Sequence, residues 1–430
     1  MKLTTLLPTA SSSQEKARIH VVYALLGTVF FMPLQIIAME ACLILALILA
    51  ARYIWKYPVA SWHDTPLFKP AALFAVLAFI SLAGSPKPLF GVAFYLFTVL
   101  QYFIFYNLIV VFVRGGEERR LFLLVFLASA AVVVLFGLYQ YAHMLTLHEE
   151  EWVDNSAFPL LRRRMYSTLY NPNLLSEFLL MAISAAFSLL IVKKRAPKKM
   201  AVLLTLLAAL ALCLILTYSR GAWLSAGALV FFFGLVWDKR LWLSFLCIPF
   251  LLAFYHGGVT HRLLSIFYHS SADTSVSMRM DMWLAALQMV GDHPMLGIGW
   301  GAFKFVYPVY NELIQQAGIT IFHAHNMYLN ILAETGIAGF CAFFWLFFGA
   351  AVYAVRFLRL PGIQPQERAM ALMTAASILA VAVSSFSDYD LFSTQISLTL
   401  WFLLGLFSNM HEEYGKRAKK SLRNNSQSHL

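Results

Sequence analysis

Apolar runs of about 20 residues recur along almost the whole chain, and one example is residues 121–143, LFLLVFLASAAVVVLFGLYQYAH. A helix of that length crosses the hydrocarbon core of a bilayer, and continuous rather than alternating apolar runs indicate helices and not a β-barrel. Since 60% of the 430 residues are hydrophobic and 12% are charged, at a mean hydropathy of +0.71, the chain is too apolar for a soluble fold. We therefore predict an all-α fold, a polytopic bundle of membrane-spanning helices.

We expect about twelve spans. They are predicted at residues 20–33, 35–53, 69–84, 89–112, 121–143, 173–192, 200–217, 222–237, 241–256, 336–355, 369–386 and 391–409. Because the residues before the first span are too polar for a cleaved signal peptide, that span is expected to remain as a signal anchor. Residues 1–410 would form one integral membrane domain, with a long outer loop, residues 257–326, that contains short helices between the ninth and tenth spans. Residues 411–430 form a basic tail that we expect to be cytoplasmic and disordered.

The lysines and arginines indicate the orientation, because positively charged loops stay in the cytoplasm. With the N-terminus inside, 24 of the 32 fall in cytoplasmic segments, and both termini are cytoplasmic. The net charge of +11 is then a topological signal, so we expect no nucleic-acid partner. The long loop faces the outside of the membrane.

Eight cations remain outside, against this bias: Lys87, Arg162, Arg163, Arg164, Arg220, Arg262, Arg279 and Lys304. Such side chains can extend to lipid headgroups or pair with carboxylates. Pairing is favoured for Arg162 to Arg164, whose loop also carries the acidic segment HEEEWVD, and a headgroup or carboxylate contact is favoured for Lys87, Arg262 and Lys304. Arg220 lies in a tight turn, LTYSRGAWLSAG, with no acidic residue nearby in the sequence, so a headgroup contact and anion binding both remain open.

Arg279 falls in a predicted amphipathic helix of the long loop, SVSMRMDMWLAALQMVGDHP, with Ser277 as its N-cap. An arginine in the first turn opposes the helix dipole by about 0.3–1 kcal/mol, but with the free amides there it forms an anion site. A pair with Asp281 is the alternative. The next segment, HPMLGIGWGAF, has glycines at alternate positions and is interpreted as a turn, because no strand precedes it as in a dinucleotide site.

The long loop ends in FHAHNMYLNILAETG, residues Phe322 to Gly336. His325 directly precedes a helical pattern, where the dipole disfavours an imidazolium, so its neutral ring can accept a proton from a hydroxyl. The ordinary alternative for a histidine at a membrane interface is a headgroup contact. His323 and His325 are also possible metal ligands, but with no third ligand at a characteristic spacing we expect no metal. Asn326 and Glu334 are expected to be helix-end and packing residues.

Two further polar features carry less weight. SDYD, residues 387–390, is similar to the acidic pair with which some glycosyltransferases hold a divalent cation, but we expect a solvated loop. Glu40 lies within the second predicted span, and a charge inside the membrane would suit a transporter.

Five segments resemble the O-antigen ligase and polymerase family and occur in the family's order. They are YNPNLLSEFLL (Tyr170 to Leu180), TYSRGAWLS (Thr217 to Ser225), MRMDMW (Met278 to Trp283), HPMLGIGWGAF (His293 to Phe303) and HAHNMYLNILAETGIAG (His323 to Gly339). The resemblance covers mainly residues 160–340, and the other spans agree with it in number and topology.

The resemblance implies a metal-independent, inverting glycosyltransferase of the GT-C type, without a cofactor, in the bacterial inner membrane. Its donor would be a glycan linked to undecaprenyl diphosphate, and its acceptor, on the periplasmic face, a lipid A-core sugar. By this resemblance, His325 activates the acceptor hydroxyl, Arg220 and Arg279 bind the diphosphate, and Lys87 is a further phosphate-binding residue. His323, Asn326 and Arg164 would support them. Fixed guanidinium groups suit this role because, without a metal, they must neutralise the leaving diphosphate.

Two other functions remain open at this point. A polymerase of O-antigen or exopolysaccharide would use the same donor but extend another lipid-linked repeat unit. A transporter for lipid-linked glycan would also use outside arginines, although the inverted repeats and broken helices common in transporters are not evident in the sequence.

Overall fold

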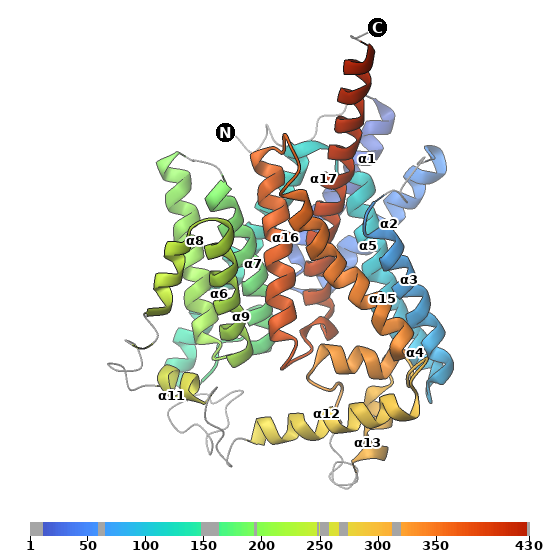
Figure 1. Ribbon diagram of the computed structural model, residues 1–430, viewed down its shortest axis with the longest axis vertical. Helices are drawn as coiled ribbons and strands as arrows, with labels where there is room; N and C mark the ends of the chain where they lie inside the picture. The colour runs from blue at the N-terminus through green and yellow to red at the C-terminus, as the bar shows by residue number, and fades with distance from the viewer. Residues whose placement is uncertain are drawn as a thin grey trace.

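The computed structural model describes residues 12–58, 65–147, 163–192, 196–246, 249, 258–265, 274–311 and 320–427, and in these residues it is all helical (Figure 1). The helices are α1 (Ser13–Phe31), α2 (Ile36–Lys56), α3 (Phe68–Ser81), α4 (Pro88–Tyr95), α5 (Gln101–Phe112), α6 (Gly115–Leu147), α7 (Pro172–Val192), α8 (Pro197–Leu216), α9 (Arg220–Val236), α11 (Gly258–Leu264), α12 (Thr274–Asp292), α13 (Phe303–Tyr310), α15 (Met327–Phe357), α16 (Pro365–Ser384) and α17 (Thr394–Gln427). The predicted all-α fold is confirmed for this part of the chain.

Seven helical segments are long and apolar enough to cross a membrane: α2, residues 88–112 across α4 and α5, α6, α7, α8, α15 and α16. Residues 68–84 and α9 are shorter apolar helices. The predicted count of about twelve is therefore not confirmed. The regions predicted at 20–33 and 391–409 are helical, in α1 and α17, but do not meet these criteria of length and composition. The span predicted at 241–256 lies largely outside the described residues, and its described start, Lys239–Leu246, is a 3-10 helix.

The helices form one bundle in which α16 and α7 are central. Of an apolar stretch of 18 residues in each helix, 83% is buried inside the protein in α16 and 67% in α7. In α2 and α8 only 28% and 22% of the corresponding stretch is buried, so these helices lie at the periphery. α11, α12 and α13 lie at one end of the bundle, and the C-terminal part of α17 extends from the opposite end (Figure 1). The long loop therefore does contain helices, and it lies at the end of the bundle opposite the tail.

The C-terminal tail continues α17 as a helix to Gln427, where we had expected disorder. Glu412 and Lys416, one helical turn apart, form an ion pair of 2.6 Å, and Arg417 contacts Glu367 at 2.9 Å. The first pair lies on one face of α17 and supports a polar helix, and the second joins α17 to α16. Inside the bundle, Glu40 accepts hydrogen bonds from the amide of Gln101 at 2.8 and 2.9 Å, so the charge that suggested a transporter has a partner within the protein.

α15 bends at Gly336, which has a φ of 65° and a ψ of −174°. The bend divides α15 into a short first segment and the longer, membrane-spanning part. A side chain there would meet the carbonyl of Met295, so the position requires glycine. The span predicted at 336–355 thus corresponds to the part of α15 after the bend. Gly297, Gly299 and Gly301 all have positive φ, as expected for a glycine turn, and Gly299 packs against Ser85.

Glu334 ties the glycine turn to the first segment of α15. Its carboxylate accepts hydrogen bonds from the backbone N–H groups of Gly301 at 3.0 Å and Phe303 at 3.2 Å, and its backbone carbonyl accepts one from Gly299 at 3.0 Å. The side chain is 2% exposed. The expected packing role is therefore carried out by a buried carboxylate that satisfies two amides of the turn.

Replacing Glu334 with alanine should destabilise the protein, because two buried N–H groups lose their acceptor. We expect the free energy of unfolding to fall by about 2–6 kcal/mol, at about 1–3 kcal/mol for each unsatisfied group. Thermal unfolding in detergent would measure this, with Glu334→Gln as control because its amide oxygen can still accept one of the two bonds. An alanine variant as stable as the glutamine variant would contradict the assignment.

Candidate active site

His325 lies directly before α15, as the sequence pattern predicted. Asn326 caps the helix: its side-chain oxygen accepts from Leu329 N–H at 3.0 Å, and its amide donates to Phe386 O at 3.1 Å. His325 itself has a positive φ of 46°, which is rare for a residue with a side chain. The backbone turn before the cap thus directs the His325 ring towards the loop between α16 and α17.

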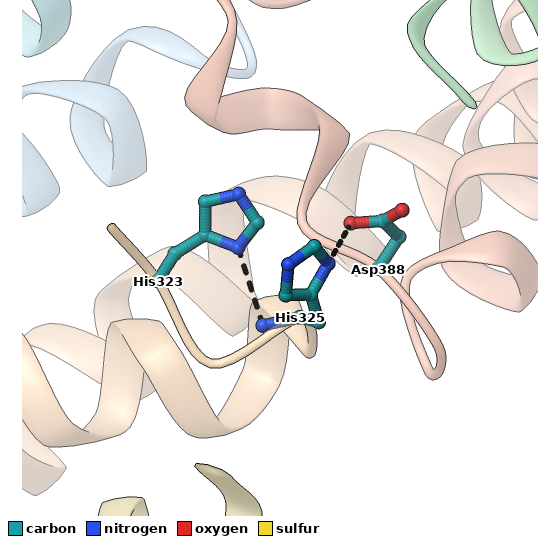
Figure 2. A group of neighbouring side chains, drawn as sticks. All are labelled: His323, His325 and Asp388. Atoms are coloured by element: carbon teal, nitrogen blue, oxygen red, sulfur yellow. Dashed lines mark hydrogen bonds and ion pairs between the residues drawn. The ribbon is translucent and has the colours of Figure 1, made fainter. Parts of the chain in front are cut away.

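Asp388, in that loop, is the partner of the His325 ring (Figure 2). Its Oδ1 lies 2.9 Å from His325 Nδ1, and the N–H of Met327 also contacts the carbonyls of Ser385 and Asp388 at 3.1 Å each. Asp388 and Asp390 are 8% and 5% exposed, so the solvated loop expected for SDYD is wrong. The two segments are 63 residues apart in the sequence, and only the packing of α15 against α16 brings them together.

The protonation of this pair follows from its surroundings. Burial acts to raise the pKa of Asp388, but the hydrogen bond from His325 and the charges of His325 and Arg279 outweigh it and hold that pKa below its usual range. An ionised carboxylate only accepts hydrogen bonds, so Nδ1 of His325 must carry a proton. In the neutral ring the lone pair is then on Nε2, and the side chain is 37% exposed. His325 is thus arranged to accept a proton at Nε2.

His323 lies beside His325, with ring centroids 4.3 Å apart (Figure 2). Burial, with the charges of His325 and Arg279, lowers the pKa of His323 to about 4, so this ring is neutral at neutral pH. Its Nδ1 accepts a hydrogen bond of 3.2 Å from the backbone N–H of His325. His323 therefore contacts the backbone turn that carries His325, as a supporting residue would.

His323, His325 and Asp388 also form a possible metal-binding group, because one ligand atom of each lies within 4.8 Å of the others. Two imidazoles and a carboxylate are a donor set that zinc accepts. The fold therefore supplies a third candidate ligand, Asp388, which stands at no characteristic spacing from the histidines in the sequence. In the structure these groups already bond to one another, and the positive charge of Arg279 acts on them. The arrangement fits proton transfer without a metal, and its donor atoms also fit a divalent cation.

Three arginines are linked to this pair by electrostatic interactions: Arg279 acts on Asp388 and His323, Arg164 interacts with Asp388, and Arg220 acts on Arg164. Arg220 is the first residue of α9, and its Nη1 lies 3.3 Å from Ser265 Oγ of the long loop. Arg279 lies in α12, and its Nε is buried without a hydrogen-bond partner among the described residues. Because α12 already runs from Thr274, Arg279 is not in the first turn, and the expected anion site made with free helix amides is wrong.

Arg164 is the third, and the carboxylates with which its pairing was predicted lie outside the described residues. Its Nε donates to Thr217 O at 2.8 Å and its Nη2 to Asn173 Oδ1 at 2.8 Å. Burial and the charges of Arg279 and Arg220 lower its pKa to about 10, while Asp388 acts in the opposite direction. Arg164 thus stays charged at neutral pH and lies within electrostatic reach of both other arginines.

The other cations of these loops have described contacts of other kinds. Lys87 is exposed at the N-terminus of α4, where its backbone N–H donates to Ser85 Oγ at 3.2 Å. No described contact joins its side chain to His325 or the arginines. Lys304 Nζ lies 4.0 Å from the centroid of the Phe90 ring, and Arg262 Nε lies 3.4 Å from Tyr218 O. The described interactions therefore link Arg164, Arg220 and Arg279 to one another or to Asp388, and none of these interactions involves Lys87.

Two residues of the site were missed from the sequence. Asp388 was assigned to solvent, and Asn173 was not singled out, although its Nδ2 donates to Asp388 Oδ2 at 2.5 Å. Asn173 lies in YNPNLLSEFLL, one of the segments that resemble the family, and that was the available signal. Asp388 had no comparable signal, because its partner is distant in the chain.

A sequence model described as O-antigen ligase matches residues 205–344, which include Arg220, Arg279, His323 and His325. No curated protein matches the chain. In its described residues the chain is all helical, with seven helices long and apolar enough to cross a membrane, and its residues 205–344 are similar to the O-antigen ligase family.

Proposed function

We propose that the protein is an O-antigen ligase of the bacterial inner membrane, with both termini in the cytoplasm and its site on the periplasmic face. It would transfer a glycan from undecaprenyl diphosphate to a lipid A-core sugar. The observation that carries the proposal is that the site combines a histidine oriented to accept a proton with three arginines that interact electrostatically with one another. Activation of a hydroxyl and binding of a diphosphate need these two groups side by side.

In the proposed reaction, His325 Nε2 takes the proton of an acceptor hydroxyl as its oxygen attacks the anomeric carbon of the donor sugar. The bond from that carbon to the diphosphate oxygen breaks, and the electron pair leaves with the diphosphate. Attack from the side opposite the leaving group inverts the anomeric centre. Asp388 holds the proton on Nδ1 and stabilises the imidazolium that forms.

The leaving group gains negative charge, and Arg220, Arg279 and Arg164 would stabilise it. Arginine suits this role because its planar fork can donate two hydrogen bonds to phosphate oxygens and stays charged. The buried Nε of Arg279 without a partner supports the assignment, since a buried donor is costly until an acceptor binds it. The apolar bundle would hold the polyprenyl chain.

Purified protein tests the proposal directly. It would be incubated with an undecaprenyl-diphosphate-linked glycan and, in separate reactions, with a lipid A-core acceptor or with a second molecule of the lipid-linked glycan. Glycan on the lipid A-core supports a ligase, and a lengthened lipid-linked glycan indicates a polymerase instead. Absence of covalent product, together with movement of the donor across proteoliposomes, would replace the proposal with a transporter.

Removal of divalent cations should leave transfer unchanged. The positive charge of Arg279 acts on the cluster of His323, His325 and Asp388, which disfavours a bound cation, and the arginines supply the charge that a metal would. Initial rates would be measured after dialysis against excess EDTA and again after addition of Zn²⁺ or Mn²⁺. Loss of activity on chelation and its recovery with either metal would assign the cluster to metal binding.

A further inference from the structure

A chain of hydrogen bonds joins the arginine side of the site to the histidine. Arg164 Nη2 donates to Asn173 Oδ1 at 2.8 Å, Asn173 Nδ2 donates to Asp388 Oδ2 at 2.5 Å, and Asp388 Oδ1 lies 2.9 Å from His325 Nδ1. At the other end, Arg164 Nε donates to Thr217 O, three residues before Arg220. Asn173 is thus the amide that joins the guanidinium of Arg164 to the carboxylate of Asp388 in a chain of four side chains.

The chemistry of its neighbours determines how the Asn173 amide is oriented. Arginine can only donate hydrogen bonds, so the atom that faces Arg164 must be the oxygen. An ionised carboxylate can only accept, so the atom that faces Asp388 must be the nitrogen. Each of its neighbours bonds to a different end of the amide. Leucine at this position could do neither, and aspartate could serve Arg164 only.

The amide also keeps two opposite charges apart. Without it, Arg164 and Asp388 could approach as an ion pair, which would divert the carboxylate from His325 and the guanidinium from a phosphate. With it, Asp388 Oδ1 remains directed at His325 and also accepts from the N–H of Tyr389 at 2.8 Å. The two oxygens of Asp388 therefore have separate partners, and one of these partners is Asn173.

We propose that Asn173 is a positioning residue that links Arg164 of the donor side to Asp388 and thereby holds His325 in the orientation needed to deprotonate the acceptor. The proposal rests on the transfer reaction proposed above. It assigns Asn173 no contact with substrate. Its effect on the rate passes through Asp388.

The test compares Asn173→Leu, Asp388→Asn and the double variant, with purified protein at saturating donor and acceptor. We expect Asn173→Leu to lower kcat by about 10- to 100-fold, because a hydrogen bond to a charged group is lost, with little change in the KM for the acceptor. Asp388→Asn should lower kcat by about 10²- to 10⁴-fold. The double variant should match Asp388→Asn within about threefold, since Asn173 acts through Asp388. Multiplicative losses would overturn the proposal.

Asn171 provides a matched control at the same end of α7. Its Oδ1 accepts from the N–H of Asn173 at 2.8 Å, so Asn171→Ala disturbs the start of the helix without removing the link to Asp388. We expect this variant to lower the melting temperature but to retain kcat. If Asn173→Leu does not fold, Asn173→Asp, of equal size and still an acceptor for Arg164, takes its place with the same expected loss. Equal losses of kcat in the Asn171 and Asn173 variants would show a structural role only.

The wild type and His325→Ala separate the two proposals. If the wild type forms no product, the proposed transfer and this inference both fail. If the wild type transfers glycan, His325→Ala does not, and the Asn173 variants match the wild type, only the role of Asn173 is wrong.

Discussion

Replacing His325 with alanine is expected to lower kcat/KM for glycan transfer by about 10²- to 10⁴-fold, the usual contribution of a general base. Nε2 of this ring carries the lone pair because the ionised Asp388 holds the proton on Nδ1 at 2.9 Å. No described neighbour offers the same arrangement, since Nδ1 of His323 accepts the backbone N–H of His325. Initial rates with purified wild type and variant, read as labelled glycan on the acceptor, would measure the loss.

The control for this variant is His293→Ala, which removes an exposed histidine of the same outer loop. It should transfer glycan at the rate of the wild type. The melting temperature of each variant checks that it folds. We expect His325→Ala to fold, because the side chain of His325 is already 37% exposed. A His325→Ala variant that folds and transfers at the rate of the His293 variant would remove His325 from the mechanism.

The sequence predicted those parts of the site that depend on local pattern. Asn326 before a helical run predicts a cap, and the structure has Asn326 as the cap with His325 directly before it. Glycines at alternate positions predict a turn, and all three have positive φ. These predictions need only the conformational preferences of short segments.

Tertiary packing decided the rest. SDYD looks like an exposed turn in the sequence, yet Asp388 is buried because the α16–α17 loop packs on the start of α15. The bonds of Arg164 to Thr217 and Asn173 likewise join segments that are separate in the sequence, whereas its predicted pairing with the acidic loop falls on residues outside those described. The limits of the other membrane helices were harder to predict, because apolar runs also form helices such as α9 that are shorter than a membrane span.

Replacing Arg279 with alanine is expected to lower kcat by about 10²- to 10³-fold and to weaken donor binding as well, because it removes a donor directed at the charge that develops on the diphosphate. Its Nε is buried without a described partner, and its charge acts on Arg164, His323 and Asp388. Arg279→Lys should recover only part of this loss, since an ammonium cannot donate the paired hydrogen bonds of a guanidinium. Rates over a range of donor concentrations, with binding of undecaprenyl diphosphate to each variant, would separate the two effects.

Lys304→Ala is the matched control, because Lys304 is another cation of the long loop and its described contacts are with aromatic rings, those of Phe90 at 4.0 Å, Phe305 at 5.0 Å and Phe322 at 5.5 Å. If outer positive charge acted only by attracting anionic substrate, both variants would weaken transfer alike, and the losses would shrink with rising salt. If Arg279 contacts the diphosphate, its loss should persist at high salt while Lys304→Ala remains near the wild type. Equal losses of transfer that shrink with salt would therefore mean that Arg279 only attracts the anionic substrate. Arg220 and Arg164 would then be the residues that bind the leaving diphosphate.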